Sequence, residues 1–237
     1  MTALSGFFEA IEYGDEPRVA ELLISSPELV HATDRHLKTP LHVAAEHDRE
    51  AISRRLIEAG ADVEAETSWA MTPLQWAANM GSTRAGRVLI AHGAAINLWS
   101  AAGLGLIDRL DAFWDAAGRL SPDAGQKGYR QTATGEYVAQ PPPSDDVAIS
   151  DAFYVACRNG HTAVARTLLA RGADVNVRGF FGGTALHWAA GNGHRDTVAF
   201  LLASGARTDL KDDQFHGTPA SWAVEFSHPG IAALLEA

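Results

Sequence analysis

Ten histidines are the residues of this 237-residue chain that first suggest chemistry. Imidazole titrates near neutral pH and binds Zn²⁺, so histidines clustered on one helix face would indicate a metal site or acid–base catalysis. Five of them are scattered over separate segments, with no pair at i, i+3 or i+4: His31, His36, His47, His92 and His216. We therefore expect no metal site.

Other catalytic signatures are absent from the sequence. It has no glycine-rich phosphate loop after a strand, no Cys-x-x-Cys, no His-Glu-x-x-His and no nucleophile elbow. The carboxylate pairs Asp145-Asp146 and Asp212-Asp213 fall in predicted loops, where we expect them to be solvated. Cys157, the single cysteine, stands where equivalent segments have alanine, which indicates a buried, inert thiol. We expect no enzyme and no cofactor.

Residues 39–66 form the segment that organises the rest of the chain. Thr39 can cap a helix and Pro40 suits its first turn, because proline lacks the N–H that is unsatisfied there. Leu41, Ala44 and Ala45 then form one apolar stripe at helical spacing. A second helix follows and ends at Gly60, the residue that adopts the left-handed C-terminal conformation most easily. The segment predicts two short antiparallel helices and an extended arm.

Altered copies of this segment fill most of the chain. The second alanine and the apolar residue eleven positions later recur in four clear copies and three weaker ones, starting at Ile11, Ala45, Ala78, Ala102, Cys157, Ala190 and Val224. Four of the six steps between them are 33 or 34 residues. The quartets that begin at Thr39, Thr72 and Thr184, with Gly-Ala-Asp at 60–62 and 172–174, resemble the ankyrin repeat.

The resemblance implies an all-α solenoid of about seven helix pairs, including two caps, in which hairpin arms called fingers join successive pairs. We expect a single domain over residues 1–237. Its units are approximately 1–34, 35–67, 68–95, 96–117, 147–179, 180–213 and 214–237, with an irregular insertion at 118–146. The short step of 24 residues from Ala78 to Ala102 predicts that the finger between units three and four is missing.

The insertion is rich in Gly, Pro, Ser, Gln and Asp and lacks helical periodicity. Tyr129, Tyr137 and Val138 on either side of residues 133–135 predict a small hairpin, and Pro141–Pro143 favour an extended segment. Two interpretations remain open: a mobile solvated loop, or a functional segment that acts as a flap or docks a partner.

Charge and hydropathy limit the kinds of partner that the chain is expected to bind. The formal net charge is −10, and no cluster of Lys or Arg offsets it, so binding to nucleic acid is not expected. The start lacks a basic signal-peptide region, and no apolar run is long enough to cross a bilayer. We expect a cytoplasmic monomer without membrane association.

Aromatic residues fall into two sets. Trp76, Trp188 and Trp222 share one slot in the first helix of their units, and we expect them to fill the core between repeats. A second set, which includes Trp69, lies in the fingers, where exposed apolar rings indicate a contact surface. Packing of these rings against adjacent fingers is the alternative interpretation.

Ankyrin proteins bind partners with their fingertips and the exposed end of the first helix, so the resemblance implies a non-catalytic scaffold for a protein or peptide on the concave face. The residues in these places are His36, Lys38, His47, Trp69, Met71, Met80, Arg158, Asn159, Phe180, Phe181, Phe215 and Phe226. The missing finger and the insertion should divide the surface in two, which predicts a bipartite partner or a groove gated by the inserted loop.

Histidines of the repeat are expected to be structural. The resemblance implies that His42 and His187 bond the backbone between repeats, and that His161, His194 and His228 occupy the turn between helices.

Two alternatives remain. A small-molecule binder or atypical enzyme would place a pocket at the junction of units three to five, lined by Trp99, Trp114, Tyr129 and Tyr137. A purely structural companion of another protein would look the same in sequence as the scaffold.

Overall fold

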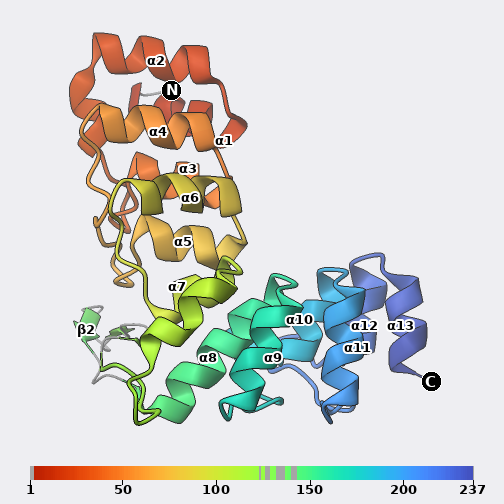
Figure 1. Ribbon diagram of the computed structural model, residues 1–237. Helices are drawn as coiled ribbons and strands as arrows, with labels where there is room; N and C mark the ends of the chain where they lie inside the picture. The colour runs from red at the N-terminus through yellow and green to blue at the C-terminus, as the bar shows by residue number, and fades with distance from the viewer. Residues whose placement is uncertain (1–2, 123, 126–128, 132–136, 140–142, 237) are drawn as a thin grey trace. The chain divides into compact units, whose positions relative to one another are not determined.

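Helices dominate the computed structural model, which describes residues 3–122, 124–125, 129–131, 137–139 and 143–236 (Figure 1). The chain divides into two compact units. Unit 1 is Met1–Ile96 with Lys127–Pro142, and unit 2 is Asn97–Gln126 with Pro143–Ala237. The all-α prediction is confirmed, with one short hairpin added to the helices. The prediction of a single domain stays a prediction.

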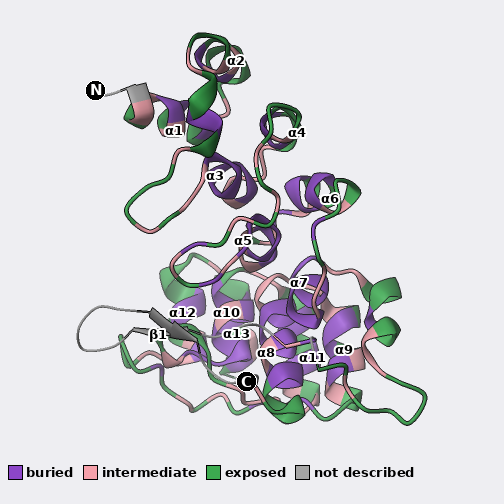
Figure 2. Ribbon diagram, turned by 90° about the vertical axis from the view of Figure 1, so that its left-hand side faces the viewer, coloured by how far each residue is buried: buried purple, intermediate pink, exposed green. Residues whose placement is uncertain are grey.

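Unit 1 is a stack of helix pairs. Its helices are α1 (Ala3–Tyr13), α2 (Glu16–Ser25), α3 (Pro40–Glu46), α4 (Glu50–Glu58), α5 (Pro73–Met80) and α6 (Thr83–Ala91), with the 3₁₀ helix η1 (Pro27–His31). Helices α1, α3 and α5 form one row, and α2, α4 and α6 form the second (Figure 2). The buried side of each row faces the other, so Phe7, Leu41 and Leu74 lie fully inside.

The predicted hairpin is present in the insertion. Strand β1 (Tyr129–Gln131) pairs antiparallel with β2 (Tyr137–Ala139), and Tyr129 lies opposite Ala139 in the register. The predicted turn at 133–135 and residues Pro141 and Pro142 of the proline run lie outside the described residues.

Unit 2 continues the helix-pair pattern after an irregular start. Its helices are α7 (Leu98–Gly103), α8 (Asp145–Arg158), α9 (Thr162–Ala170), α10 (Ala185–Gly191), α11 (Arg195–Ala203), α12 (Pro219–Glu225) and α13 (Pro229–Leu235), with the 3₁₀ helices η2 (Ile107–Phe113) and η3 (Phe180–Gly182). Only residues 92–97 separate α6 from α7, which confirms the prediction that the finger between the third and fourth repeats is missing. In the fourth repeat, the second element is η2 rather than an α-helix. Leu110 is the only buried residue of η2, so this segment lacks the apolar stripe with which an α-helix would pack on the core.

Threonine caps start the first helices as their sequence indicates. Thr39 and Thr72 each accept a hydrogen bond from the backbone N–H three residues on, and Thr218 does the same for Ser221 at the start of α12. These bonds satisfy donors that have no partner within the helix. The cap at Thr218 therefore fixes where the helix that carries Trp222 begins.

Thr218→Ala is expected to lower the free energy of unfolding by about 1 kcal/mol, since the cap acceptor is lost. Urea unfolding at neutral pH measures this effect. Thr218→Ser keeps the hydroxyl and serves as the matched control. Equal stability of the alanine and serine variants would show that Thr218 does not cap α12.

Candidate interaction surface

Four fingers are described by the structure, two in each unit, and each carries an aromatic ring at its tip. The tip turns through a left-handed residue that is not glycine: Leu37 (φ 60°), Ala70 (φ 54°), Phe181 (φ 59°) and His216 (φ 53°). The residue directly before each of these is a ring: His36, Trp69, Phe180 and Phe215. One turn geometry therefore presents a ring at the same place in every described finger.

In unit 1 the rings form a stack. The rings of His36 and Trp69 lie 4.8 Å apart between centroids, and Trp69 lies 6.1 Å from Trp76 of α5, with their planes nearly parallel. The Lys38 ammonium sits 5.2 Å from the Trp76 centroid and also pairs with Glu46. Trp69 keeps 37% of its surface exposed. We call His36, Lys38, Glu46, Trp69 and Trp76 the unit-1 surface.

Three further residues predicted in unit 1 lie beside this surface. Met80, at the end of α5, is exposed, and His47, directly after α3, is half-buried. Met71 is half-buried, and its backbone carbonyl accepts a hydrogen bond from His42 Nε2 at 2.9 Å. Met71 therefore has a structural role through its backbone.

In unit 2 the rings form a larger cluster. Phe181 lies 6.3 Å from Trp188 of α10 and 6.2 Å from Phe215 of the next finger. The ring of Phe215 lies 6.5 Å from Trp222, which in turn lies 6.1 Å from Phe226 at the end of α12. Phe181, Phe215 and Phe226 remain 52%, 65% and 57% exposed. The finger rings of unit 2 thus pack against the adjacent finger, as in the alternative interpretation, and still leave half or more of their surface exposed to solvent.

Arg158 completes this cluster. Its guanidinium lies 4.4 Å from the Trp188 centroid and 5.7 Å from that of Phe180, which is 50% exposed. Burial lowers the pKa of Arg158 below its ordinary value. We call Arg158, Phe180, Phe181, Trp188, Phe215 and Phe226 the unit-2 surface. Asn159 lies next to it but donates to the carbonyl of Gly103 at 2.7 Å, so its amide supports α7.

The tryptophan prediction is partly wrong. Trp222 is buried, with 7% exposed, as expected of a core residue. Trp76 and Trp188 are only half-buried, because a fingertip ring rather than a neighbouring repeat covers one side of each. The sequence did hold a signal for this arrangement: ring and tryptophan are seven residues apart in Trp69-Trp76, Phe181-Trp188 and Phe215-Trp222.

Asp212 corrects the expectation that the Asp212-Asp213 pair is solvated, because only 1% of Asp212 is exposed. Its carboxylate accepts hydrogen bonds from Trp222 Nε1 at 3.0 Å and from the backbone N–H groups of Gln214, Phe215 and Gly217. Burial alone would raise its pKa, but these four donors outweigh burial and lower it to about 2. Asp212 thus holds the Phe215 finger against α12.

Asp213 and the other predicted carboxylate pair are exposed as expected, but the loop predicted for Asp145-Asp146 is wrong, because both residues lie in the first turn of α8. Asp213 is exposed and pairs with Arg178 at 3.2 Å, and Asp145 and Asp146 are exposed at the start of α8.

Asp212→Asn is expected to lower the free energy of unfolding by about 2 kcal/mol, since an amide offers one acceptor oxygen to donors that now share two. Urea unfolding measures the loss. Asp213→Asn, which changes an exposed neighbour, should stay within about 0.5 kcal/mol of the parent chain. Equal losses at the two positions would contradict the role given to Asp212.

The repeat histidines and the cysteine are structural, as predicted. His42 and His187 bond the threonine at the start of their helix through Nδ1 and the next finger's carbonyl through Nε2, with Met71 and Gly217 as acceptors. His161 bonds the carbonyl of Gly103. Cys157 is fully buried, and burial raises the pKa of its thiol. No group of three potential metal ligands occurs within the described ranges.

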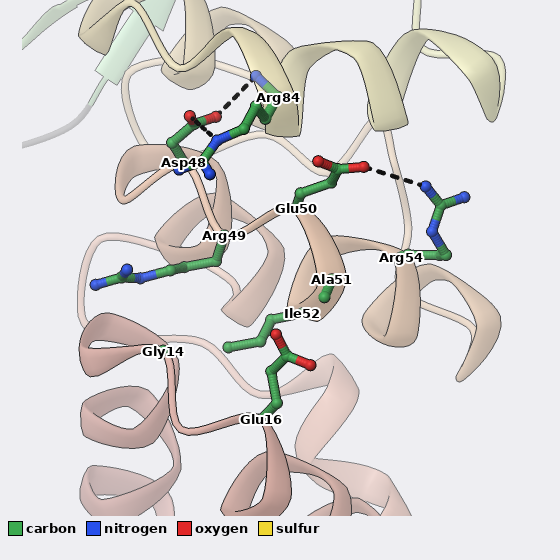
Figure 3. A pocket seen from close by; sticks show the side chains of 9 residues that line it. All are labelled: Gly14, Glu16, Asp48, Arg49, Glu50, Ala51, Ile52, Arg54 and Arg84. Atoms are coloured by element: carbon green, nitrogen blue, oxygen red, sulfur yellow. Dashed lines mark hydrogen bonds and ion pairs between the residues drawn. The ribbon is translucent and has the colours of Figure 1, made fainter.

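A surface cavity of about 360 Å³ lies in unit 1, near the turns that join helices within the pairs (Figure 3). Its charged side chains largely satisfy one another: Asp48 pairs with Arg84, Glu50 with Arg54, and Arg49 donates to the carbonyl of Glu12. This arrangement links repeats one to three.

The alternative pocket gains no support from the residues predicted to line it. Trp99 is buried in the core of unit 2, and Trp114 is half-buried with Arg171 over its ring at 4.4 Å. Tyr129 and Tyr137 lie in the hairpin strands, and their side chains are outside those described.

Comparison with known proteins agrees with this architecture. The family model of ankyrin repeats (3 copies) matches residues 7–99 and 153–237. The chain belongs to the ankyrin repeat family. None of the helices in the described part of the chain has the length and apolar character needed to cross a membrane.

Several curated proteins are similar over parts of the chain. Palmitoyltransferase Hip14 of Drosophila melanogaster is 31% identical over 51% of this chain and 19% of its own length. Human neurogenic locus notch homolog protein 1 is 24% identical over 86% of this chain and 6% of its own. The mouse B-cell lymphoma 3 protein homolog is 26% identical over 83% of this chain and 35% of its own. The chain thus spans about a third or less of each of these relatives.

Proposed function

We propose that this chain is a non-catalytic scaffold that binds a protein or peptide through its fingertips and the exposed ends of its first helices. The observation that carries the proposal is the aromatic ring at the tip of every described finger, which is exposed in three of the four and half-buried in the case of His36. Aromatic and arginine side chains with a polar surround are typical of the energetic centre of protein interfaces.

Preorganisation supports the same function. The unit-1 rings are already stacked, Arg158 is already held between two rings, and Asp212 fixes the Phe215 finger by four hydrogen bonds. Side chains fixed before binding lose little conformational entropy in a complex. Such a surface favours tight binding without further folding.

We further propose that each unit binds its own segment of a bipartite partner, as a cytoplasmic monomer. The two surfaces lie in separate compact units and share the same construction: a fingertip ring, a half-buried tryptophan and a cation over that tryptophan.

Partner capture from the native host tests this proposal, with wild-type chain, Trp69→Ala in unit 1, Phe215→Ala in unit 2 and the double variant as baits. We expect each single variant to recover less of a shared partner and the double variant to recover none. Ile24→Ala is the control, because Ile24 is an exposed apolar residue of α2 that belongs to neither surface. Recovery of the same proteins by wild type and double variant would overturn the proposal.

A further inference from the structure

A histidine ties two of the fingers to the repeat before them. In finger 2, which ends at Met71, the Met71 carbonyl accepts a hydrogen bond from His42 Nε2 at 2.9 Å. In finger 4, which ends at Gly217, the Gly217 carbonyl accepts one from His187 Nε2 at 3.0 Å. Both histidines lie on the first helix of the preceding repeat, in the fourth place of its motif. The bond therefore fixes the end of each finger against that helix.

Finger 3, residues 178–183, lacks this tie. Tyr154 of α8 fills the histidine slot, and Gly183 ends the finger. The Tyr154 hydroxyl is buried and forms no hydrogen bond within the described residues. The Gly179 N–H still donates to the Gly183 carbonyl at 3.0 Å and closes the base of the finger, as equivalent bonds do in fingers 2 and 4. Finger 3 is thus built like its neighbours, but no such bond holds it to the helix behind it.

A second buried donor lies beneath the same finger. Trp188 Nε1 is shielded from solvent and has no hydrogen-bond partner in the described part of the chain. A Cβ on Gly179 would lie 2.2 Å from Cζ of Tyr154, and a Cβ on Gly183 would lie 3.3 Å from Trp188 Nε1. The backbone of finger 3 therefore covers both groups. Because a buried donor without an acceptor is unfavourable, the closed finger carries a penalty that its opening would relieve.

Trp222 shows which group satisfies an indole in this slot. It lies 34 residues after Trp188, in the equivalent place of the next repeat, and its Nε1 donates to the Asp212 carboxylate at 3.0 Å. Asp212 precedes its tryptophan by ten residues, and the residue ten before Trp188 is Arg178. Arg178 brings a cation rather than an acceptor, and it pairs with Asp213. The carboxylate that finger 4 supplies to its indole is therefore not supplied by finger 3.

Charge beside the two donors favours a carboxylate over a neutral acceptor. The Arg158 guanidinium lies 4.4 Å from the Trp188 centroid. Burial raises the pKa of Tyr154, and Arg158 and the Trp188 indole act against that rise, so both lie near the hydroxyl. Asp151, three residues before Tyr154 on α8, is half-buried and brings the opposing charge. Arg158 follows Tyr154 by four residues, so an anion is favoured at the Arg158 end of this row.

The backbone of finger 3 suits an opening movement. Three of its six residues are glycines, and Phe181 holds a left-handed conformation at φ 59°, which is strained for a residue with a side chain. The Phe181 carbonyl accepts a hydrogen bond from the Asp213 N–H at 2.9 Å, which joins finger 3 to finger 4. Movement away from α8 costs ring contacts, such as that between Phe180 and Tyr154 at 6.4 Å, but no histidine bond.

We propose that finger 3 is a lid that opens when a partner binds, and that the opened site takes a carboxylate side chain of the partner against Tyr154 Oη and Trp188 Nε1, next to Arg158. The inference rests on the proposed function and names the group that its unit-2 surface recognises. The contact between Asp212 and Trp222 is the internal example of this recognition. The unit-2 surface then combines a fixed finger 4 with an adaptable finger 3.

Amide hydrogen exchange of the full chain, resolved by residue with NMR, tests the lid. We expect the Gly179 N–H to exchange at least tenfold faster than the equivalent Thr67 and Asp212 N–H groups, after correction for intrinsic rates. Tyr154→His restores the repeat histidine, so it should slow exchange at Gly179 at least tenfold. Circular dichroism of each variant verifies that it is folded.

Trp188→Phe and Trp222→Phe are a matched pair. The first removes a donor that has no acceptor, so exchange at Gly179 should slow at least threefold. The second takes a donor away from the Asp212 carboxylate, so exchange at the Asp212 N–H should become faster. Equal exchange at the three finger bases, or no response of Gly179 to Tyr154→His, would overturn the lid.

N-acetylaspartate and N-acetylasparagine test the carboxylate, with the indole N–H signal of Trp188 as the readout. We expect a saturable shift with N-acetylaspartate at concentrations up to about 100 mM, and at least tenfold weaker binding of N-acetylasparagine. Tyr154→His, which keeps the lid closed, should weaken N-acetylaspartate at least tenfold, and Arg158→Gln about three- to tenfold. The Trp222 indole, which already has Asp212 as its acceptor, should not respond.

The outcomes separate this inference from the proposed function. No shift with either compound, or equal shifts with both, would overturn the carboxylate as the ligand. Failure of the exchange and indole tests, with partner capture still dependent on Phe215, would overturn the inference and leave the scaffold function standing. If capture is independent of Phe215 and Trp69, the proposed function falls as well.

Discussion

Replacing Phe180, Phe181 and Phe215 together with alanine is expected to lower the affinity of the chain for its partner at least a hundredfold. Each ring is exposed by half or more, and the three occupy the tips of two adjacent fingers. Truncating an aromatic residue at the centre of an interface costs about 2 kcal/mol or more, and three such losses exceed the roughly 2.7 kcal/mol that a hundredfold change requires. Titration of the captured partner by calorimetry measures the effect.

The same variant should remain folded. The half-exposed rings pack on Trp188 and Trp222 but enclose little of the core, so we expect the free energy of unfolding to fall by about 1–2 kcal/mol in total. Phe153→Ala, which empties a fully buried site in α8, is the contrasting control and should cost about 3–5 kcal/mol. A loss of the same size in the triple variant would identify the finger rings as core instead of contact residues.

Local chemistry explains how much of the fold could be predicted from the sequence. Thr39, Pro40 and Gly60 set the start of one helix and the end of the next through bonds made within a few residues, so the repeat was readable from single positions. The missing finger followed from chain length alone. The finger rings were also predictable, because a short arm between helices has no core in which to bury them.

Contacts between distant residues account for what was missed. Nothing near Asp212 in sequence indicates burial, which depends on the Trp222 indole ten residues away and on the turn of its own finger. The partial exposure of Trp188 likewise depends on distant side chains, because Arg158 of α8, Phe181 of the finger and Trp222 of α12 all contact its ring without burying it fully. The fourth repeat has the 3₁₀ helix η2 in place of an α-helix because few of the apolar residues of η2 reach the core.

Acid is expected to unfold this chain at a pH well above that at which its carboxylates protonate. Burial holds the pKa of His42 at about 4, against 6.5 in an unfolded chain, despite its bond to the Met71 carbonyl. Burial also lowers the pKa values of His161, His187 and His194. The unfolded chain therefore binds more protons, so stability is full above pH 6.5 and falls as the pH drops from 6.5 toward 4.

His42 alone should remove about 2 kcal/mol of stability at pH 5 and about 3 kcal/mol near pH 4, since one pKa unit corresponds to about 1.4 kcal/mol. The chain supplies a matched variant. Gln75 fills the same slot in α5, where its Oε1 accepts the capping bond from the Thr72 N–H, so His42→Gln keeps this bond and removes the titration.

Urea unfolding from pH 8 to pH 4 compares the two chains. His42→Gln should lose about 2 kcal/mol less than the parent chain between pH 7 and pH 5, and the remaining loss belongs to the other buried histidines. The Asp212 carboxylate does not interfere, because its pKa of about 2 moves its own loss below pH 4. Parallel stability curves for parent and variant would mean that His42 is protonated as easily in the folded chain as in the unfolded one. That result would be incompatible with a neutral imidazole bridging α3 and the next finger.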